Sequence, residues 1–176
     1  MAMISNAHIV MVGLMGTGKS TVGSLLADRL HRQFFDNDVL LEARTGHTAA
    51  SIRRDEGQGA LHEYEAEVLL DCLATQPGAV IAAAASTVLN APVRDALRAA
   101  FVIWLRADLR ALTERLVNPG TRPLFGNIGD VLAHQDEDRE ALYASIADVA
   151  IDTSARTAVQ VVEQLLERIA EPPQSR

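Results

Sequence analysis

Short, nearly continuous runs of apolar residues alternate along this chain with longer stretches in which apolar residues recur every three or four positions. Near-continuous runs are typical of strands covered on both faces, as in a parallel sheet, and the recurring pattern is typical of amphipathic helices. Alternating strands and helices predict an α/β domain with right-handed crossovers. We expect strands at residues 8–12, 33–35, 79–83, 101–105 and 149–151.

Polar and glycine-rich positions mark where these elements begin and where the pattern stops. Thr48 and Asp108 each precede a helical stretch and carry a side-chain oxygen that can cap a helix N-terminus. Residues 118–129 follow neither period and contain two prolines, three glycines and Arg122. A loop of this length in a compact domain is either disordered or functional, often as a lid. We expect a lid at about residues 118–129.

Composition and charge exclude several classes of protein. The chain has 176 residues, 48% of them hydrophobic and 22% charged, which suits one globular domain over residues 1–176. The formal net charge of −7 disfavours binding to nucleic acid or to an anionic membrane. No apolar run approaches the roughly 18 residues that span a bilayer, and the first residues lack the pattern of a signal peptide. We expect a cytoplasmic monomer. A single cysteine, Cys72, excludes an internal disulfide and a clustered-cysteine metal site.

The strongest chemical signal is the sequence GLMGTGKS at residues 13–20, which matches the phosphate-loop pattern GxxxxGK[ST] in full. Glycines let such a loop turn its N–H groups toward phosphate oxygens, and the helix that follows adds its positive dipole end. We expect Lys19 to reach the β- and γ-phosphates and the Ser20 hydroxyl to bind Mg²⁺. ATP is favoured over GTP because no NKxD signature is present. The residues expected to contact the nucleotide here are Gly13, Met15, Gly16, Thr17, Gly18, Lys19, Ser20 and Thr21.

Two carboxylates, Asp36 and Asp38, follow the second expected strand. Acidic groups at the carboxyl end of a parallel strand face the crevice where ligands bind. One carboxylate could help to hold magnesium while the other orients or deprotonates a substrate hydroxyl. The alternative is a helix-capping aspartate beside a solvated one.

Four segments resemble the shikimate kinase family in order and spacing: GLMGTGKSTVG, FFDNDVLLEARTGHTAASI, the RPL of the expected lid, and REALYASIADVAIDT. The resemblance covers nearly the whole chain. It implies a three-layer P-loop kinase fold, with a five-stranded parallel sheet in order 2-3-1-4-5, flanking helices and a mobile lid. It also implies transfer of the γ-phosphate of ATP to a ring hydroxyl of shikimate, a small hydroxylated acceptor bound by a helical region at about residues 37–75.

The same resemblance implies roles for particular side chains. Asp36 matches the magnesium-associated carboxylate, and Asp38 matches the carboxylate that binds substrate hydroxyls and acts as base. Arg122 matches the lid arginine that closes on the phosphates. Arg115 falls where the family has an arginine beside adenine, and Arg139 falls where one grips the substrate carboxylate.

Two of these arginines have alternative interpretations. Arg115 lies at the end of an amphipathic helix, where it would also complement the helix dipole. Arg139 lies in the acidic run 136–140, where a surface ion pair is the alternative.

The first departure from the family pattern is His62, which aligns with an arginine that forms a second grip on the acceptor carboxylate. Histidine is mostly neutral at pH 7 and lacks the bidentate fork of a guanidinium. A buried charge-assisted hydrogen bond contributes about 1.5 to 3 kcal/mol, so its loss would weaken binding roughly ten- to a hundredfold. The neighbours Glu63 and Glu65 supply no replacement cation.

The second departure is Ala84, Ala85 and Ser86, which align with three glycines that end the third strand in the family. Side chains there should shrink the acceptor pocket and re-aim its backbone amides. Ser86 or Thr87 would in compensation offer a new hydroxyl contact. An ordinary strand end with no ligand role is the alternative.

Two rival functions remain open at this point. One is a same-fold kinase for a different hydroxylated acceptor, either gluconate-like or unidentified. The other is a nucleotide-binding regulator that has lost catalysis. The intact residues Lys19, Ser20, Asp36, Asp38 and Arg122 favour an enzyme.

Overall fold

The computed structural model describes residues 6–75, 78–117 and 128–170. Each strand boundary lies within one residue of the range expected from the apolar runs. In chain order the elements are β1 (Ile9–Val12), α1 (Lys19–Leu30), β2 (Phe34–Asp36), α2 (Asn37–Thr45), α3 (Ala49–Asp55), α4 (Gln58–Thr75), β3 (Val80–Ala82), a short 3-10 helix η1 (Thr87–Leu89), α5 (Ala91–Leu97), β4 (Phe101–Arg106), α6 (Leu109–Val117), α7 (Ile128–Ile146), β5 (Val149–Asp152) and α8 (Ala158–Ala170).

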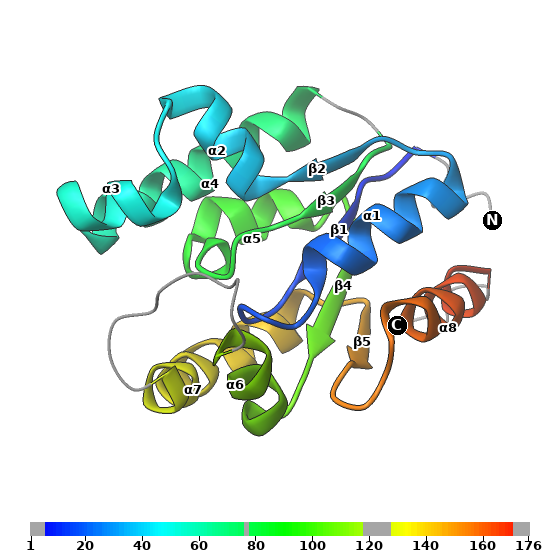
Figure 1. Ribbon diagram of the computed structural model, residues 1–176. Coiled ribbons are helices and arrows are strands. Elements are labelled where there is room, and N and C mark those ends of the chain that lie inside the picture. Colours follow the sequence, from blue (N-terminus) through cyan, green and yellow to red (C-terminus); the bar gives the residue numbers. More distant parts are fainter. Residues whose placement is uncertain (1–5, 76–77, 118–127, 171–176) are drawn as a thin grey trace.

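The strands form one parallel sheet in the order β2-β3-β1-β4-β5, which confirms the expected topology. β1 is central, with β3 on one side and β4 on the other, so the loop after β1 lies where the strand order reverses (Figure 1). Parallel α/β sheets bind ligands at such a switch point, outside the carboxyl ends of the strands.

Helices cover both faces of the sheet, and this explains why every residue of β1 is apolar. Val10 and Val12 pack in a core with side chains of α4, α5, α6 and α7. Ile9 and Met11 point to the opposite face and pack with α1 and α8. Because successive side chains of a strand point to opposite faces, a strand covered on both sides needs apolar residues at every position.

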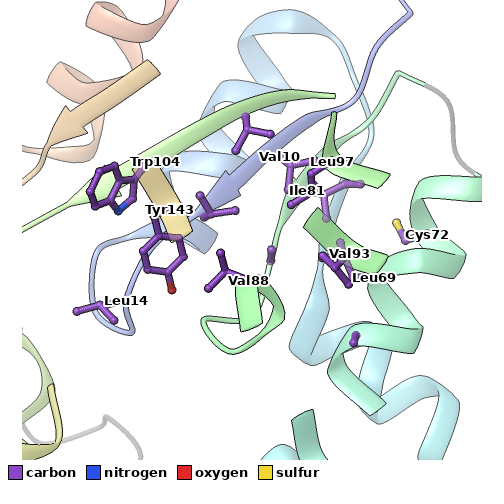
Figure 2. Close-up of a cluster of buried hydrophobic side chains, with 14 of the residues drawn as sticks. Val10, Leu14, Leu69, Cys72, Ile81, Val88, Val93, Leu97, Trp104 and Tyr143 are labelled. Carbon is purple, nitrogen blue, oxygen red and sulfur yellow. The ribbon is translucent and has the colours of Figure 1, made fainter. Parts of the chain in front are cut away.

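Figure 2 shows the first of these cores, in which Trp104 of β4 lies beside Tyr143 of α7. Their ring centroids are 5.8 Å apart, and both residues are buried. Cys72 of α4 belongs to the same core, and burial raises the pKa of its thiol to about 11. Trp104 is therefore a core residue, and Cys72 is a structural thiol.

A smaller apolar cluster holds α2, α3 and α4 together, and these helices fill the region expected to bind an acceptor, about residues 37–75. Thr48 caps α3 by accepting a hydrogen bond from the Ser51 N–H at 3.2 Å. Asp108 caps α6 by accepting one from Ala111 at 2.7 Å. Both expected caps are confirmed.

The expected lid lies mostly outside the described residues, and Arg122 lies there with it. Ile128 and Gly129, which were expected to end the lid, belong to α7. No helix in the part of the chain that the structure describes is long and apolar enough to cross a membrane.

Gly13 offers a test of how tightly the phosphate loop is packed against the sheet. An added Cβ would lie 2.3 Å from the Leu105 carbonyl oxygen, and the backbone φ of +139° disfavours any side chain. We expect Gly13→Ala to lower the free energy of unfolding by more than about 2 kcal/mol, measured by urea denaturation. Gly46→Ala is the matched control, since φ is +72° and nothing lies within 4 Å of its added Cβ. A cost of about 1 kcal/mol is expected there, and equal costs for the two variants would contradict the clash.

Candidate active site

The phosphate loop leaves β1 and ends at Lys19, the first residue of α1. Its glycines have the positive φ angles that the tight turn requires: 139° at Gly13, 84° at Gly16 and 95° at Gly18. The Lys19 ammonium donates hydrogen bonds to the carbonyl oxygens of Gly13 at 2.9 Å and Leu14 at 3.0 Å. The lysine is thereby held across the loop that is expected to surround the phosphates.

The charge of Lys19 is only partly compensated by its surroundings. Burial lowers its pKa to about 8, while the carboxylates of Asp38, Asp36 and Glu65 act in the opposite direction. Arg139 adds a smaller effect that also lowers the pKa. A cation whose charged form costs free energy is prepared to bind an anion, because a phosphate would remove that cost.

Ser20 and Asp36 form the pair expected at the magnesium site. The Ser20 hydroxyl donates to Asp36 Oδ2 at 2.5 Å, and Asp36 Oδ1 accepts from the Asp38 N–H at 2.9 Å. Asp36 therefore caps α2, as one interpretation had it, and also faces the phosphate loop. An adjacent hydroxyl and carboxylate suit a hard cation that takes its remaining ligands from phosphate and water. Within the described ranges no three acidic, histidine or cysteine side chains cluster as a metal site of their own.

One cavity of about 830 Å³ joins the phosphate loop to α3, α4 and α7. It is lined by nearly all the described residues that the sequence singled out. Gly13 is the exception, since it packs against Leu105 and supports the loop from behind. The expected site residues that line the cavity are Met15, Gly16, Thr17, Gly18, Lys19, Ser20, Thr21, Asp36, Asp38, His62, Ala84, Ala85, Ser86, Arg115 and Arg139.

Arg139 is buried, with 6% of its surface exposed, and lines the cavity from α7. It donates a hydrogen bond to the Gln135 side chain at 3.4 Å, and its charge acts on the nearby Tyr143 hydroxyl. The alternative of a surface ion pair within the acidic run is therefore wrong, because the helix turns this one residue of the run inward.

The segment Ala84–Ala85–Ser86 does not close the cavity, although each residue carries a side chain where the family has glycine. None of the three has a positive φ, so the backbone here needs no glycine. Both hydroxyls have partners within the protein: Ser86 donates to the buried Glu65 carboxylate, and Thr87 donates to the Ala84 carbonyl at 2.7 Å. The pocket wall is thus stabilised from within. A contact of either hydroxyl with the acceptor stays a prediction.

His62 lies beside the arginines of the pocket. Burial, then the charges of Arg139 and Arg53, lower the pKa of its imidazole. The ring is therefore neutral at pH 7, as the sequence indicated. Its Nε2 lies 3.3 Å from the Gln58 amide nitrogen.

Arg115 connects two loops at the nucleotide end of the cavity. Its guanidinium donates to the Gly16 carbonyl at 3.2 Å and to the carbonyl oxygens of Thr153 at 2.5 Å and Ser154 at 3.3 Å. Arg115 therefore does more than complement the dipole of α6. Contact with adenine stays a prediction.

Sequence reasoning missed several residues of this site. Arg53 and Gln135 line the cavity, Glu65 fixes Ser86, and Tyr143 donates to the Ala85 carbonyl at 2.8 Å. The sequence does contain a pattern that could have indicated Arg53. Two adjacent arginines end a short helix within the expected acceptor region, and either could bind an anion. Tyr143 had no such pattern, because an aromatic residue on an apolar helix face is normally only core.

A phosphate loop, an adjoining serine–aspartate pair and a cavity of about 830 Å³ at the switch point are the features of a P-loop kinase. The family model described as shikimate kinase matches residues 15–170. A shikimate kinase from Symbiobacterium thermophilum is 40% identical over 169 residues, covering 93% of this chain and 97% of that protein. The chain therefore belongs to the shikimate kinase family, and it is an ATP-dependent kinase.

Solved structures agree with this assignment. Shikimate kinase from Acinetobacter baumannii, in complex with shikimate, superposes with a TM-score of 0.88 at 30% identity, over 96% of this chain and 95% of that one. A gluconokinase from Sinorhizobium meliloti superposes with a TM-score of 0.64 at 20% identity, over 93% of each chain. The second likeness shows a common fold alone and gives no support to a gluconate acceptor.

The lowered pKa of Lys19 predicts how nucleotide affinity depends on pH. Only the ammonium form pairs with phosphate, so binding should weaken as the pH rises through about 8, the pKa in the free protein. Between pH 7 and pH 9 we expect the Kd for MgATP to rise about tenfold, measured by titration calorimetry. Lys19→Arg keeps its charge at both pH values, and its Kd should change less than about twofold. An equal rise in that variant would assign the pH dependence to another group.

The contact between Tyr143 and Ala85 predicts a stability cost for a single lost hydroxyl. Tyr143→Phe leaves the Ala85 carbonyl without this donor and should lower the free energy of unfolding by about 1 to 3 kcal/mol in denaturant titrations. Tyr64→Phe is the control, because its solvent-exposed hydroxyl lies 3.3 Å from Glu56. That change should stay within about 0.5 kcal/mol, and matching costs would mean that the Ala85 contact contributes nothing.

Proposed function

We propose that this kinase transfers the γ-phosphate of ATP to a ring hydroxyl of shikimate, with Mg²⁺ as the metal. The observation that carries the proposal is the single cavity in which the phosphate loop and the buried Arg139 face the same space. A phosphate donor and an anionic acceptor can therefore be bound together, which is what direct transfer requires.

The residues around the phosphate loop are proposed to bind the phosphate donor, ATP. Lys19 and the loop N–H groups neutralise the β- and γ-phosphates, and Arg115 holds the loop against the segment after β5. Ser20 and Asp36 would hold Mg²⁺, and the bound ion would supply positive charge next to the phosphates. Arg122, which lies outside the described residues, is proposed as the lid cation.

Asp38 is proposed as the residue that orients the acceptor hydroxyl and takes its proton. It lines the cavity and lies near enough to Lys19 to raise the pKa of that ammonium. A carboxylate held between the donor phosphates and the acceptor is placed to accept a proton as the new bond forms.

The acceptor half retains room for a small ring. Ala84 and Ala85 line the cavity without filling it, and the shikimate kinase of Acinetobacter baumannii binds shikimate on the same fold. A related hydroxy acid is the second candidate acceptor, because His62 stands where the family has an arginine.

We infer that the enzyme is a monomer built as a single domain over residues 1–176. ATP as the donor supports a cytoplasmic enzyme.

The test is a coupled assay of ADP release with ATP, Mg²⁺ and shikimate beside a panel of hydroxy acids and polyols. Lys19→Ala should lower kcat by at least about a hundredfold, through lost charge stabilisation. Asp38→Asn should lower kcat by about 10² to 10⁴ while the Kd for MgATP stays unchanged. Chelation of Mg²⁺ should abolish turnover. Normal kcat in Asp38→Asn would sink the assignment of the base, and turnover of polyols alone would sink shikimate as acceptor.

A further inference from the structure

Two adjacent arginines at the end of α3, Arg53 and Arg54, line the cavity and differ in their hydrogen-bond partners. Arg54 donates from Nε and Nη2 to the two carboxylate oxygens of Asp55, both at 2.7 Å. Arg53 makes no hydrogen bond or ion pair with any residue in the described ranges of the chain. The Arg54 guanidinium is therefore neutralised by Asp55. Arg53 lines the cavity without such a partner among the described residues.

Arg53 lies near His62, the position at which this chain departs from the family pattern. Its charge, together with that of Arg139, acts on His62 of α4. Side chains from α3, α4 and α7 thus converge on one part of the cavity, and two of the three carry a permanent positive charge. The nearby carboxylate of Glu65 also faces this region, but it accepts the hydrogen bond of Ser86.

Two guanidinium groups around a neutral imidazole make a site for an anion. Like charges that share a space repel one another, and an anionic ligand relieves that repulsion. A guanidinium matches the two oxygens of a carboxylate with parallel hydrogen bonds, whereas a neutral imidazole donates a single one.

We propose that Arg53 is a specificity-determining residue, which with Arg139 binds the carboxylate of the acceptor and supplies the cation that position 62 lacks. The cation has moved from α4 to the preceding helix, α3, so the preference for an acid over a neutral acceptor is kept. This inference rests on the proposed function, and it narrows the acceptors to hydroxy acids as opposed to neutral polyols.

The experiment compares the binding of shikimate with that of its neutral carboxamide by titration calorimetry. The two compounds differ only at the group that Arg53 is proposed to bind, because the amide replaces the charged carboxylate with a neutral group that has one acceptor oxygen. Wild-type protein should bind the acid at least tenfold more tightly than the amide. Arg53→Gln should raise the Kd for the acid about tenfold and leave that for the amide within twofold. Because Arg53 is exposed, the variant should unfold at the wild-type temperature.

Arg54→Gln is the matched control, since it makes the same change one residue along the same helix. Its guanidinium is held by Asp55, so the preference for the acid should stay within twofold of wild type. An unchanged preference in Arg53→Gln, or an equal loss in both variants, would overturn the inference. An equal loss of preference in both variants would mean that binding of the acid depends only on the total charge of α3.

Binding and turnover separate this inference from the proposed function. If acid binding depends on Arg53 but shikimate is not phosphorylated, the inference stands and the proposed reaction fails. If a neutral polyol is the acceptor that turns over, with the same KM in wild type and Arg53→Gln, the inference fails while the kinase remains.

Discussion

Lys19 is an ammonium group in a partly buried place, and the loop around it offsets the cost of removing it from water. Two carbonyl oxygens of the loop accept hydrogen bonds from it, and the carboxylates of Asp36 and Asp38 partly oppose the desolvation that lowers its pKa to about 8. This incomplete compensation is what makes the cavity a phosphate site, because a nucleotide supplies the missing negative charge. The loop begins at the end of β1, whose side chains are packed on both faces of the sheet.

The phosphate loop is contiguous in sequence, whereas the wall of the proposed acceptor pocket depends on contacts between distant segments. Ser86 at the end of the β3 region reaches Glu65 on α4, and Tyr143 on α7 reaches Ala85. The same tyrosine stacks on Trp104 in the core. The wall of the acceptor pocket is thereby tied to the hydrophobic packing under the sheet, so its shape is set by the core as much as by the residues that face the cavity.

The structure shows why larger residues fit the backbone at the positions that align with the family's glycines. The backbone at Ala84, Ala85 and Ser86 adopts ordinary negative φ angles, so no glycine is needed for conformation. Only space could require glycine there, and a cavity of about 830 Å³ remains. The substitutions at this strand end and at His62 thus alter the chemistry of the acceptor pocket without closing it.

The sequence by itself determined the strands, the helix caps at Thr48 and Asp108, the phosphate loop and the strand order implied by the family resemblance. The strands, the caps and the phosphate loop follow from local patterns, because continuous apolar runs, a capping oxygen and a glycine spacing act within a few residues of themselves. The strand order joins distant segments, so it came from the family resemblance. The tertiary structure alone decided that Arg139 turns inward out of an acidic run, that Ser86 pairs with Glu65, and that Arg53 and Arg139 act on the same histidine. Those contacts join residues from different helices, and no local pattern records which side chains will meet once the helices pack against the sheet.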